Sequence, residues 1–162
     1  MHYLVDAYNL LFRVLKKRGS LEKSRQSLIE ELNEMTSQLN LHVTLVFDGA
    51  EEHLRGHFDT LEIVYTRKTQ TADEYISEEV FLSRSPSQLT VVTNDRELST
   101  RCSHHLAKTM SIDEFLHLIS KKKMKKKRLG PPRTFRDSQS QIARLLIIFE
   151  KKMLEDLTKD FF

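Results

Sequence analysis

Short apolar runs alternate with longer amphipathic stretches along the first 120 residues, and this alternation predicts strands that alternate with helices. The runs expected to be strands are residues 3–5, 41–47, 61–65, 89–93 and 106–110. The stretches expected to be helices are residues 8–17, 21–39, a helix opening at 71–74, 96–103 and a helix opening at 111–114. This order predicts an α/β three-layer fold with a mainly parallel central sheet.

Two of the predicted helices begin with a capping box, in which a Ser or Thr and a Glu three residues later satisfy each other's backbone N–H groups. Thr71 with Glu74 and Ser111 with Glu114 have this spacing. Apolar residues at three- and four-residue spacing predict the buried helix faces: Leu21, Leu28, Ile29, Leu32, Met35 and Leu39, then Ile76, Val80 and Phe81, then Ile112, Phe115, Leu116 and Ile119. The polar segment 49–60 is expected to be mostly loop, with strand 61–65 near a sheet edge.

Three of the predicted strands lead directly into an acidic residue. The first ends at Asp6, the second at Asp48, and the fourth runs on to Asp95. A further acid, Asp73, lies in the first turn of a predicted helix. Neutral oxygen donors accompany these acids: Asn9, Thr93 and Asn94. Ligands bind at the carboxyl ends of the strands in an open parallel sheet, so we expect these side chains to converge on one site.

Carboxylates that converge in this way repel one another, by about 4 kcal/mol for two unit charges ~4 Å apart at an effective dielectric constant of ~20. A divalent cation would offset this repulsion. A ligand set of oxygens without Cys or His suits Mg²⁺ or Mn²⁺ rather than zinc. A hard cation held by carboxylates is the usual apparatus for hydrolysing phosphodiester bonds.

The charge of the chain is divided unevenly. Residues 1–120 have a net charge of −5, from 13 basic and 18 acidic residues, and residues 121–162 have a net charge of +8, from 13 basic and 5 acidic residues. One run holds seven of the cations: Lys121, Lys122, Lys123, Lys125, Lys126, Lys127 and Arg128. A solvated helix end would explain this run, but the acidic body favours a contact with an anionic partner such as RNA.

The C-terminal part of the chain is expected to be separate from the α/β body. We predict a domain over residues 1–120, a basic segment and Gly-Pro-Pro linker over 121–137, and an amphipathic helix within 138–162. That helix either packs on the domain or pairs with another molecule. Its periodicity leaves both open, and the oligomeric state with them.

Cysteine usage and the N-terminus favour a cytoplasmic protein. Cys102 is the single cysteine, which excludes an internal disulfide and suits a reducing compartment. No basic stretch precedes an apolar run at the N-terminus, as a secretory signal requires. No apolar run approaches the ~18 residues needed to span a bilayer.

Four short motifs resemble, in order and spacing, the signatures of YacP-like NYN domains, a family of the PIN-like nuclease superfamily. They are Asp-Ala-Tyr-Asn-Leu at 6–10, Val-Phe-Asp at 46–48, Thr-Ala-Asp-Glu-Tyr-Ile at 71–76 and Val-Val-Thr-Asn-Asp-Arg at 91–96. The resemblance implies a PIN-like fold and a metal-dependent ribonuclease, with Mg²⁺ or Mn²⁺ as the ion that the donor set suits. Some relatives are ribosome-associated endoribonucleases that cut mRNA, which is the activity we expect here. The resemblance also implies a metal-binding core of Asp6, Asp73 and Asp95, assisted by Asn9 and Asp48. Asn94 departs from the family pattern, which has a small residue or serine before the last aspartate.

The sequence pattern also fits other functions. The same fold would serve a non-catalytic RNA- or ribosome-binding module, or a toxin-type PIN ribonuclease. An aspartyl-phosphate phosphatase would need a second aspartate two residues after Asp6, where the chain has Tyr8. Each acid also has a structural interpretation: Asp73 as a helix N-terminal acid, Asp95 as an N-cap and Asp48 as a turn residue.

Overall fold

The protein has an α/β architecture in this computed structural model, which describes residues 1–14, 20–49 and 56–129. Its strands are β1 (His2–Asp6), β2 (His42–Phe47), β3 (Gly56–His57), β4 (Leu61–Tyr65), β5 (Leu89–Val92) and β6 (Lys108–Met110). Its helices are α1 (Ala7–Val14), α2 (Leu21–Leu39), α3 (Ala72–Leu82), the 3₁₀ turn η1 (Pro86–Gln88), α4 (Arg96–His104) and α5 (Ile112–Leu129). The chain divides into two units, Met1–Ile119 and Ser120–Phe162.

The strands form one sheet in the order β3-β4-β2-β1-β5-β6. The five neighbouring strands β4, β2, β1, β5 and β6 run parallel to one another. The edge strand β3 is antiparallel to its neighbour β4. The predicted three-layer α/β class is therefore confirmed. Segment 49–60 was expected to be mostly loop, and within it the two residues Gly56–His57 pair along the edge of β4. A strand of two residues is too short to show any periodicity in the sequence.

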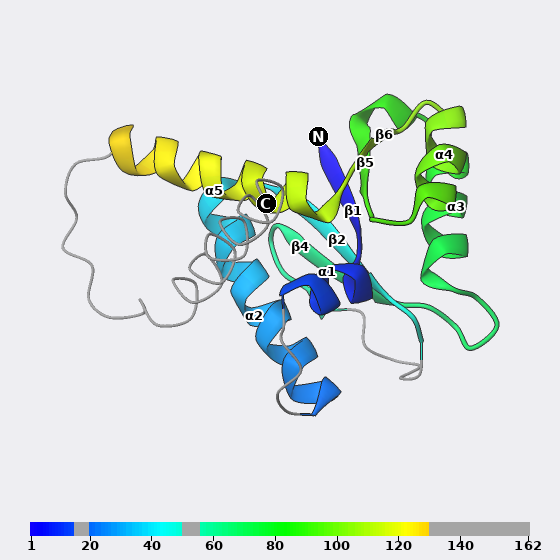
Figure 1. Cartoon of the computed structure of the whole chain (residues 1–162), viewed down its shortest axis with the longest axis horizontal. Coiled ribbons are helices and arrows are strands. Elements are labelled where there is room, and N and C mark those ends of the chain that lie inside the picture. Colours follow the sequence, from blue (N-terminus) through cyan, green and yellow to red (C-terminus); the bar gives the residue numbers. More distant parts are fainter. Residues whose placement is uncertain (15–19, 50–55, 130–162) are drawn as a thin grey trace, which may run out of the picture. The chain divides into compact units, whose positions relative to one another are not determined.

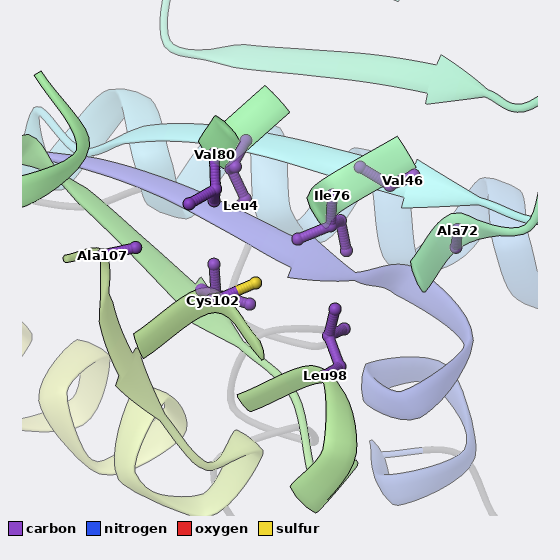
Figure 2. Close-up of a cluster of buried hydrophobic side chains, with 9 residues drawn as sticks. Leu4, Val46, Ala72, Ile76, Val80, Leu98, Cys102 and Ala107 are labelled. Carbon is purple, nitrogen blue, oxygen red and sulfur yellow. The ribbon is translucent and has the colours of Figure 1, made fainter. Parts of the chain in front are cut away.

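Successive side chains of β1 face opposite layers, as the two-residue period of a strand requires. Leu4 belongs to a cluster with residues of α3 and α4, and Figure 2 shows Ile76 and Leu98 directed toward it from those two helices. Tyr3 instead packs against Phe115 of α5, with ring centroids 5.4 Å apart. In Figure 1, α3 and α4 accordingly lie on one side of the strands, with α2 on the other.

Both predicted capping boxes are present. The hydroxyl of Thr71 accepts from the backbone N–H of Glu74 at 3.2 Å, and the Glu74 carboxylate accepts from the N–H of Thr71 at 2.9 Å. The matching distances for Ser111 and Glu114 are 3.1 and 2.7 Å. These boxes mark the first residues of α3 and α5. The box at Thr71 thereby places Asp73 in the first turn of α3.

Three expectations about buried positions and strand length were wrong. Phe81 and Leu21 are 66% and 48% exposed, since each lies at a helix end that no other layer covers fully. The last strand begins at Lys108 rather than at residue 106. Leu106 has a φ of 66° and is 75% exposed, a left-handed conformation that cannot continue a strand.

Several predicted features lie outside the described residues: the end of the first helix beyond residue 14, the Gly-Pro-Pro linker and the helix at 138–158. Among the residues that are described, no helix is both long and apolar enough to cross a membrane.

Replacing Phe115 by Ala should lower the free energy of unfolding by about 3–5 kcal/mol, because the ring is fully buried and the cavity would not refill. Urea denaturation followed by circular dichroism measures this change. The matched control is Phe81→Ala, which removes a ring that is 66% exposed and should change stability by about 0.5 kcal/mol or less. Equal losses in the two variants would contradict the assignment of the core.

Candidate active site

The register of the sheet brings three strand ends to one edge. Asp6 at the end of β1 is level with Val46, two residues before Asp48. Val5 is level with Val92, so the chain leaving β5 toward Asp95 starts beside Asp6. The chain runs outward from β1 to β2 and β4, and then returns to β5 on the opposite side of β1. The carboxyl ends of the paired strands β1 and β5 thus form a topological switch point, where ligands of open α/β sheets bind.

Asp6 is a buried carboxylate held by the first turn of the helix that follows it. Only 6% of the residue is exposed. One oxygen accepts from the backbone N–H of Asn9 at 3.2 Å, and the other accepts from the Asn9 side-chain amide. Burial raises the pKa of Asp6, the hydrogen bonds from Asn9 lower it, and the charge of Asp48 raises it again. Asn9 therefore orients Asp6 and stabilises its charged form.

Asp48 connects the end of β2 to the start of α3. Its Oδ1 accepts from the backbone N–H of Ala72 at 2.6 Å, which fixes the residue before Asp73. The turn after Asp48 is tight, because a Cβ on Gly49 would lie 1.9 Å from the carbonyl oxygen of Thr66. The backbone N–H of Gly49 also donates to the Thr66 hydroxyl at 3.0 Å. Glycine at this position is what allows β2 to deliver Asp48 to the site.

The segment after β5 uses its polar side chains to start two helices. Oδ1 of Asp95 accepts from the backbone N–H groups of Glu97 and Leu98 at 2.7 and 3.0 Å, which makes Asp95 the N-cap of α4. The Thr93 hydroxyl accepts from the N–H of Asp95 at 3.0 Å. The Oδ1 of Asn94 accepts from the N–H of Ile112 at 3.0 Å, at the first residue of α5.

The pKa of Asp73 depends on the charges of the other three acids. Its pKa is raised by burial first, and then by the charges of Asp6, Asp95 and Asp48 in that order. Only the charge of Arg101 opposes this shift. Four carboxylates from distant parts of the sequence therefore share one electrostatic neighbourhood. Among the described residues, no group of three or more His, Cys, Asp or Glu side chains is arranged to hold a metal ion.

Arg101 is a residue of this neighbourhood that the sequence alone did not single out. It lies on α4, pairs with Glu97 at 3.1 Å and donates to the Ser77 hydroxyl of α3 at 3.4 Å. The four-residue spacing from Glu97 indicates the ion pair. Nothing in the sequence indicates that the same guanidinium reaches α3 near Asp73, because that contact depends on how the two helices pack.

The lysine run lies within α5. The helix is unbroken from Ile112 to Leu129 and carries the run along its second half. Exposed side chains of this run are Lys121, Lys122, Lys125, Lys126 and Lys127, with Lys123 half-buried. The Arg128 side chain lies outside what is described. The run belongs to the second unit of the chain, separate from the acids.

Comparison with known proteins gives consistent matches. The family model described as the YacP-like NYN domain matches residues 3–161. The chain is 33% identical over 102 residues to the uncharacterized protein YacP of Bacillus subtilis (strain 168), an alignment that spans 57% of this chain and 59% of that relative. A crystal structure of Rae1 (YacP) from Bacillus subtilis superposes with a TM-score of 0.60 at 24% identity, covering 98% of this chain and 93% of that one. A mutant of the same protein gives a TM-score of 0.62 with 99% of both chains covered.

Replacing Asp73 by Asn should stabilise the metal-free protein at neutral pH. A carboxyl whose pKa is raised on folding binds more protons in the folded than in the unfolded state, so stability falls as pH rises from the ordinary pKa of 3.8 through the raised value. The neutral Asn escapes this loss. Thermal unfolding with a chelator should therefore show a higher Tm for the variant at about pH 7 and no difference at about pH 3.

The control for this comparison is Asp59→Asn, which removes an exposed carboxylate that is not among the four acids. It should leave the Tm unchanged across the same pH range. A wild-type protein as stable as Asp73→Asn at neutral pH would show that the four charges do not interact.

Proposed function

The chain belongs to the YacP-like NYN domain family, which is a PIN-like nuclease family, and from this premise we propose that it is a metal-dependent endoribonuclease hydrolysing RNA phosphodiester bonds. The observation that carries the proposal is the sheet register, which brings the ends of β1, β2 and β5, the strands that lead to Asp6, Asp48 and Asp95, to one edge. The raised pKa of Asp73, caused first by burial and then by the charges of the other three acids, agrees with it. Negative charge concentrated at a topological switch point is the arrangement that a phosphodiester-cleaving cation site requires.

The donor chemistry supports Mg²⁺ or Mn²⁺ as the cation. All four acids offer carboxylate oxygens, the ligands that hard divalent cations prefer. Hydrogen bonds within the described residues use Oδ1 of Asp48 and of Asp95, and none uses Oδ2 of either. Repulsion opposes a closer approach of the carboxylates until a cation offsets their charge. Asp6, Asp73 and Asp95 would hold the ion.

The chain's own residues would then act on the scissile phosphate as follows. When bound, the cation polarises the phosphate and an attacking water. Asp48, anchored through Oδ1 on the N–H of Ala72, orients that water with its second oxygen. Asn9 keeps Asp6 in position by two hydrogen bonds. Thr93 holds the turn that carries Asp95. Attack in line with the leaving 3′ oxygen would yield a product with a 5′-phosphate.

RNA is the substrate class that the charges favour. The acidic body of the protein repels phosphates, so an attractive element is needed elsewhere in the chain. The cations at Lys121–Lys127 and Arg128 supply it, and mRNA on the ribosome is the substrate that we propose within this class. We also propose that the protein acts in the cytoplasm, where such a substrate is found.

Asp6→Asn should reduce RNA cleavage by more than about 100-fold, because even partners of metal ligands contribute 10- to 100-fold. The assay compares wild type and variant on naked and translated RNA with Mn²⁺, Mg²⁺ or a chelator. Circular dichroism should show the variant folded, since Asn has nearly the shape of Asp. Asp59→Asn is the matched control and should cleave at the wild-type rate.

Three results would overturn this proposal. Cleavage that persists in chelator would exclude the metal, and unchanged cleavage by Asp6→Asn would remove that residue from the site. RNA binding without cleavage by the wild type, on either substrate and with either ion, would instead identify a non-catalytic binding module.

The lysine run should determine how RNA binding depends on salt. Changing Lys121, Lys122, Lys125 and Lys127 to Gln should make the slope of log K against log salt shallower by about 3, at ~0.7 per single-strand phosphate contact. A fluorescence titration of a single-stranded oligonucleotide at several salt concentrations measures this slope. The control changes four other exposed cations, Lys23, Lys68, Arg84 and Lys108, to Gln. An equal change in both variants would show that only net charge matters.

A further inference from the structure

Four aromatic rings form a continuous series at the carboxyl edge of the sheet. Phe12 stacks on Tyr8, with centroids 5.8 Å apart and ring planes at 23°. Tyr8 meets Phe47 edge-on at 5.5 Å and 84°. Phe47 stacks on Tyr65 at 5.2 Å and 16°. Phe47 is fully buried, so the series is anchored in the core at Phe47 and reaches the surface at Phe12.

This series begins at strand ends that also lead to the proposed catalytic acids, but Phe47 faces the layer opposite to the one that Val46 shares with α3 and α4. Tyr8 follows Asp6 by two residues at the start of α1, and Phe47 directly precedes Asp48 at the end of β2. Phe12 is one helical turn beyond Tyr8 on α1, which Figure 1 shows at the end of β1. The exposed end of the series therefore lies on α1, the helix that begins directly after Asp6.

The core does not explain Phe12. The buried side of α1 is formed by Ala7, Leu10, Leu11 and Val14, and Phe12 lies off that side, 64% exposed. Single exposed apolar residues are common and by themselves need no explanation. Phe12 differs in presenting a flat ring, already stacked on a second ring, on the helix that directly follows Asp6, in a protein whose proposed substrate is a nucleic acid.

We propose that Phe12 and Tyr8 form a stacking platform for an unpaired base of single-stranded RNA. The proposal rests on the proposed function. Bases of single strands stack on aromatic side chains largely without regard to sequence. Stacking needs no positive charge, so it would hold the RNA where carboxylates repel its phosphates. Bases within a duplex are already stacked on one another, and the platform therefore selects single-stranded RNA.

The test uses single-stranded RNA that carries the fluorescent base 2-aminopurine, whose emission is quenched on stacking. Chelator is present throughout, so that no cleavage occurs. Wild type should quench the emission, and the same strand in a duplex should show little quenching. Phe12→Leu keeps an apolar side chain but removes the flat ring, and should bind the single strand about tenfold more weakly with the quenching lost. Phe12→Trp keeps a flat ring, so this variant should retain both the affinity and the quenching of the wild type.

The matched control is Phe81→Leu. Phe81 is as exposed as Phe12, at 66% against 64%, and also contacts one ring, that of His105. It lies in the last turn of α3, whereas Asp73 lies in the first. Affinity and quenching should equal those of the wild type. If Phe81→Leu lost as much affinity and quenching as Phe12→Leu, any exposed apolar side chain would bind the RNA equally well. That result would overturn the proposed platform.

Salt separates the platform from the lysine run. Stacking involves no release of counterions, so Phe12→Leu should weaken binding by the same factor at low and high salt. A salt slope that changes with Phe12→Leu, or quenching that survives it, would overturn the proposal. The proposed function fails separately: if the wild type does not cleave RNA with Mn²⁺ or Mg²⁺ yet quenches 2-aminopurine in chelator, the platform stands and the nuclease does not.

Discussion

Repulsion among carboxylates at one edge of the sheet is the interaction on which the candidate site depends. Asp6 is buried and Asp73 is half-buried, and for both residues burial is the largest cause of a raised pKa, with other acids adding to it. A single change to Asn would relieve this repulsion at almost no cost in shape. The fold instead brings the strand ends that lead to Asp6, Asp48 and Asp95 to one edge, and we expect the repulsion to lower the stability of the metal-free protein. Such a cost is characteristic of functional sites, where local conflict is offset by the rest of the fold.

The starts of helices hold these acids in place. The N–H of Ala72 at the start of α3 anchors Asp48, two N–H groups of α4 anchor Asp95, and the N–H of Asn9 in α1 anchors Asp6. These N–H groups have no partner within their own helices, so the same bonds complete the helix and orient the acid. The positive end of each helix dipole also reduces the repulsion that gathering the acids creates. Fold and site therefore share one set of contacts.

Binding a polyanion at an acidic edge requires forces that do not depend on the charge of that edge. The chain offers two of them in different places. Cations follow one another along the second half of α5, and an exposed aromatic ring lies on α1, the helix that follows Asp6. The first acts at a distance and weakens with salt, whereas the second acts in contact and does not. Their combination would let the acids remain available to a cation.

The sequence by itself determined the local features of this protein. The bounds of α2 and β4 agree with the predicted segments, and both capping boxes formed, because periodicity and capping depend on residues close in the chain. The parallel order of the strands also predicted that the strand ends leading to Asp6, Asp48 and Asp95 lie at one edge of the sheet, as the register shows.

Contacts between distant residues were decided only by the tertiary structure. Asn94 bonds to the start of α5, Arg101 reaches Ser77 of α3, and Phe12 stacks outward from the buried side of its helix. Periodicity states which side chains share a face, but not how far the next layer extends, and so Phe81 and Leu21 were wrongly expected to be buried. Hydrogen bonds and packing across such separations depend on helix and strand placement, which no local pattern encodes.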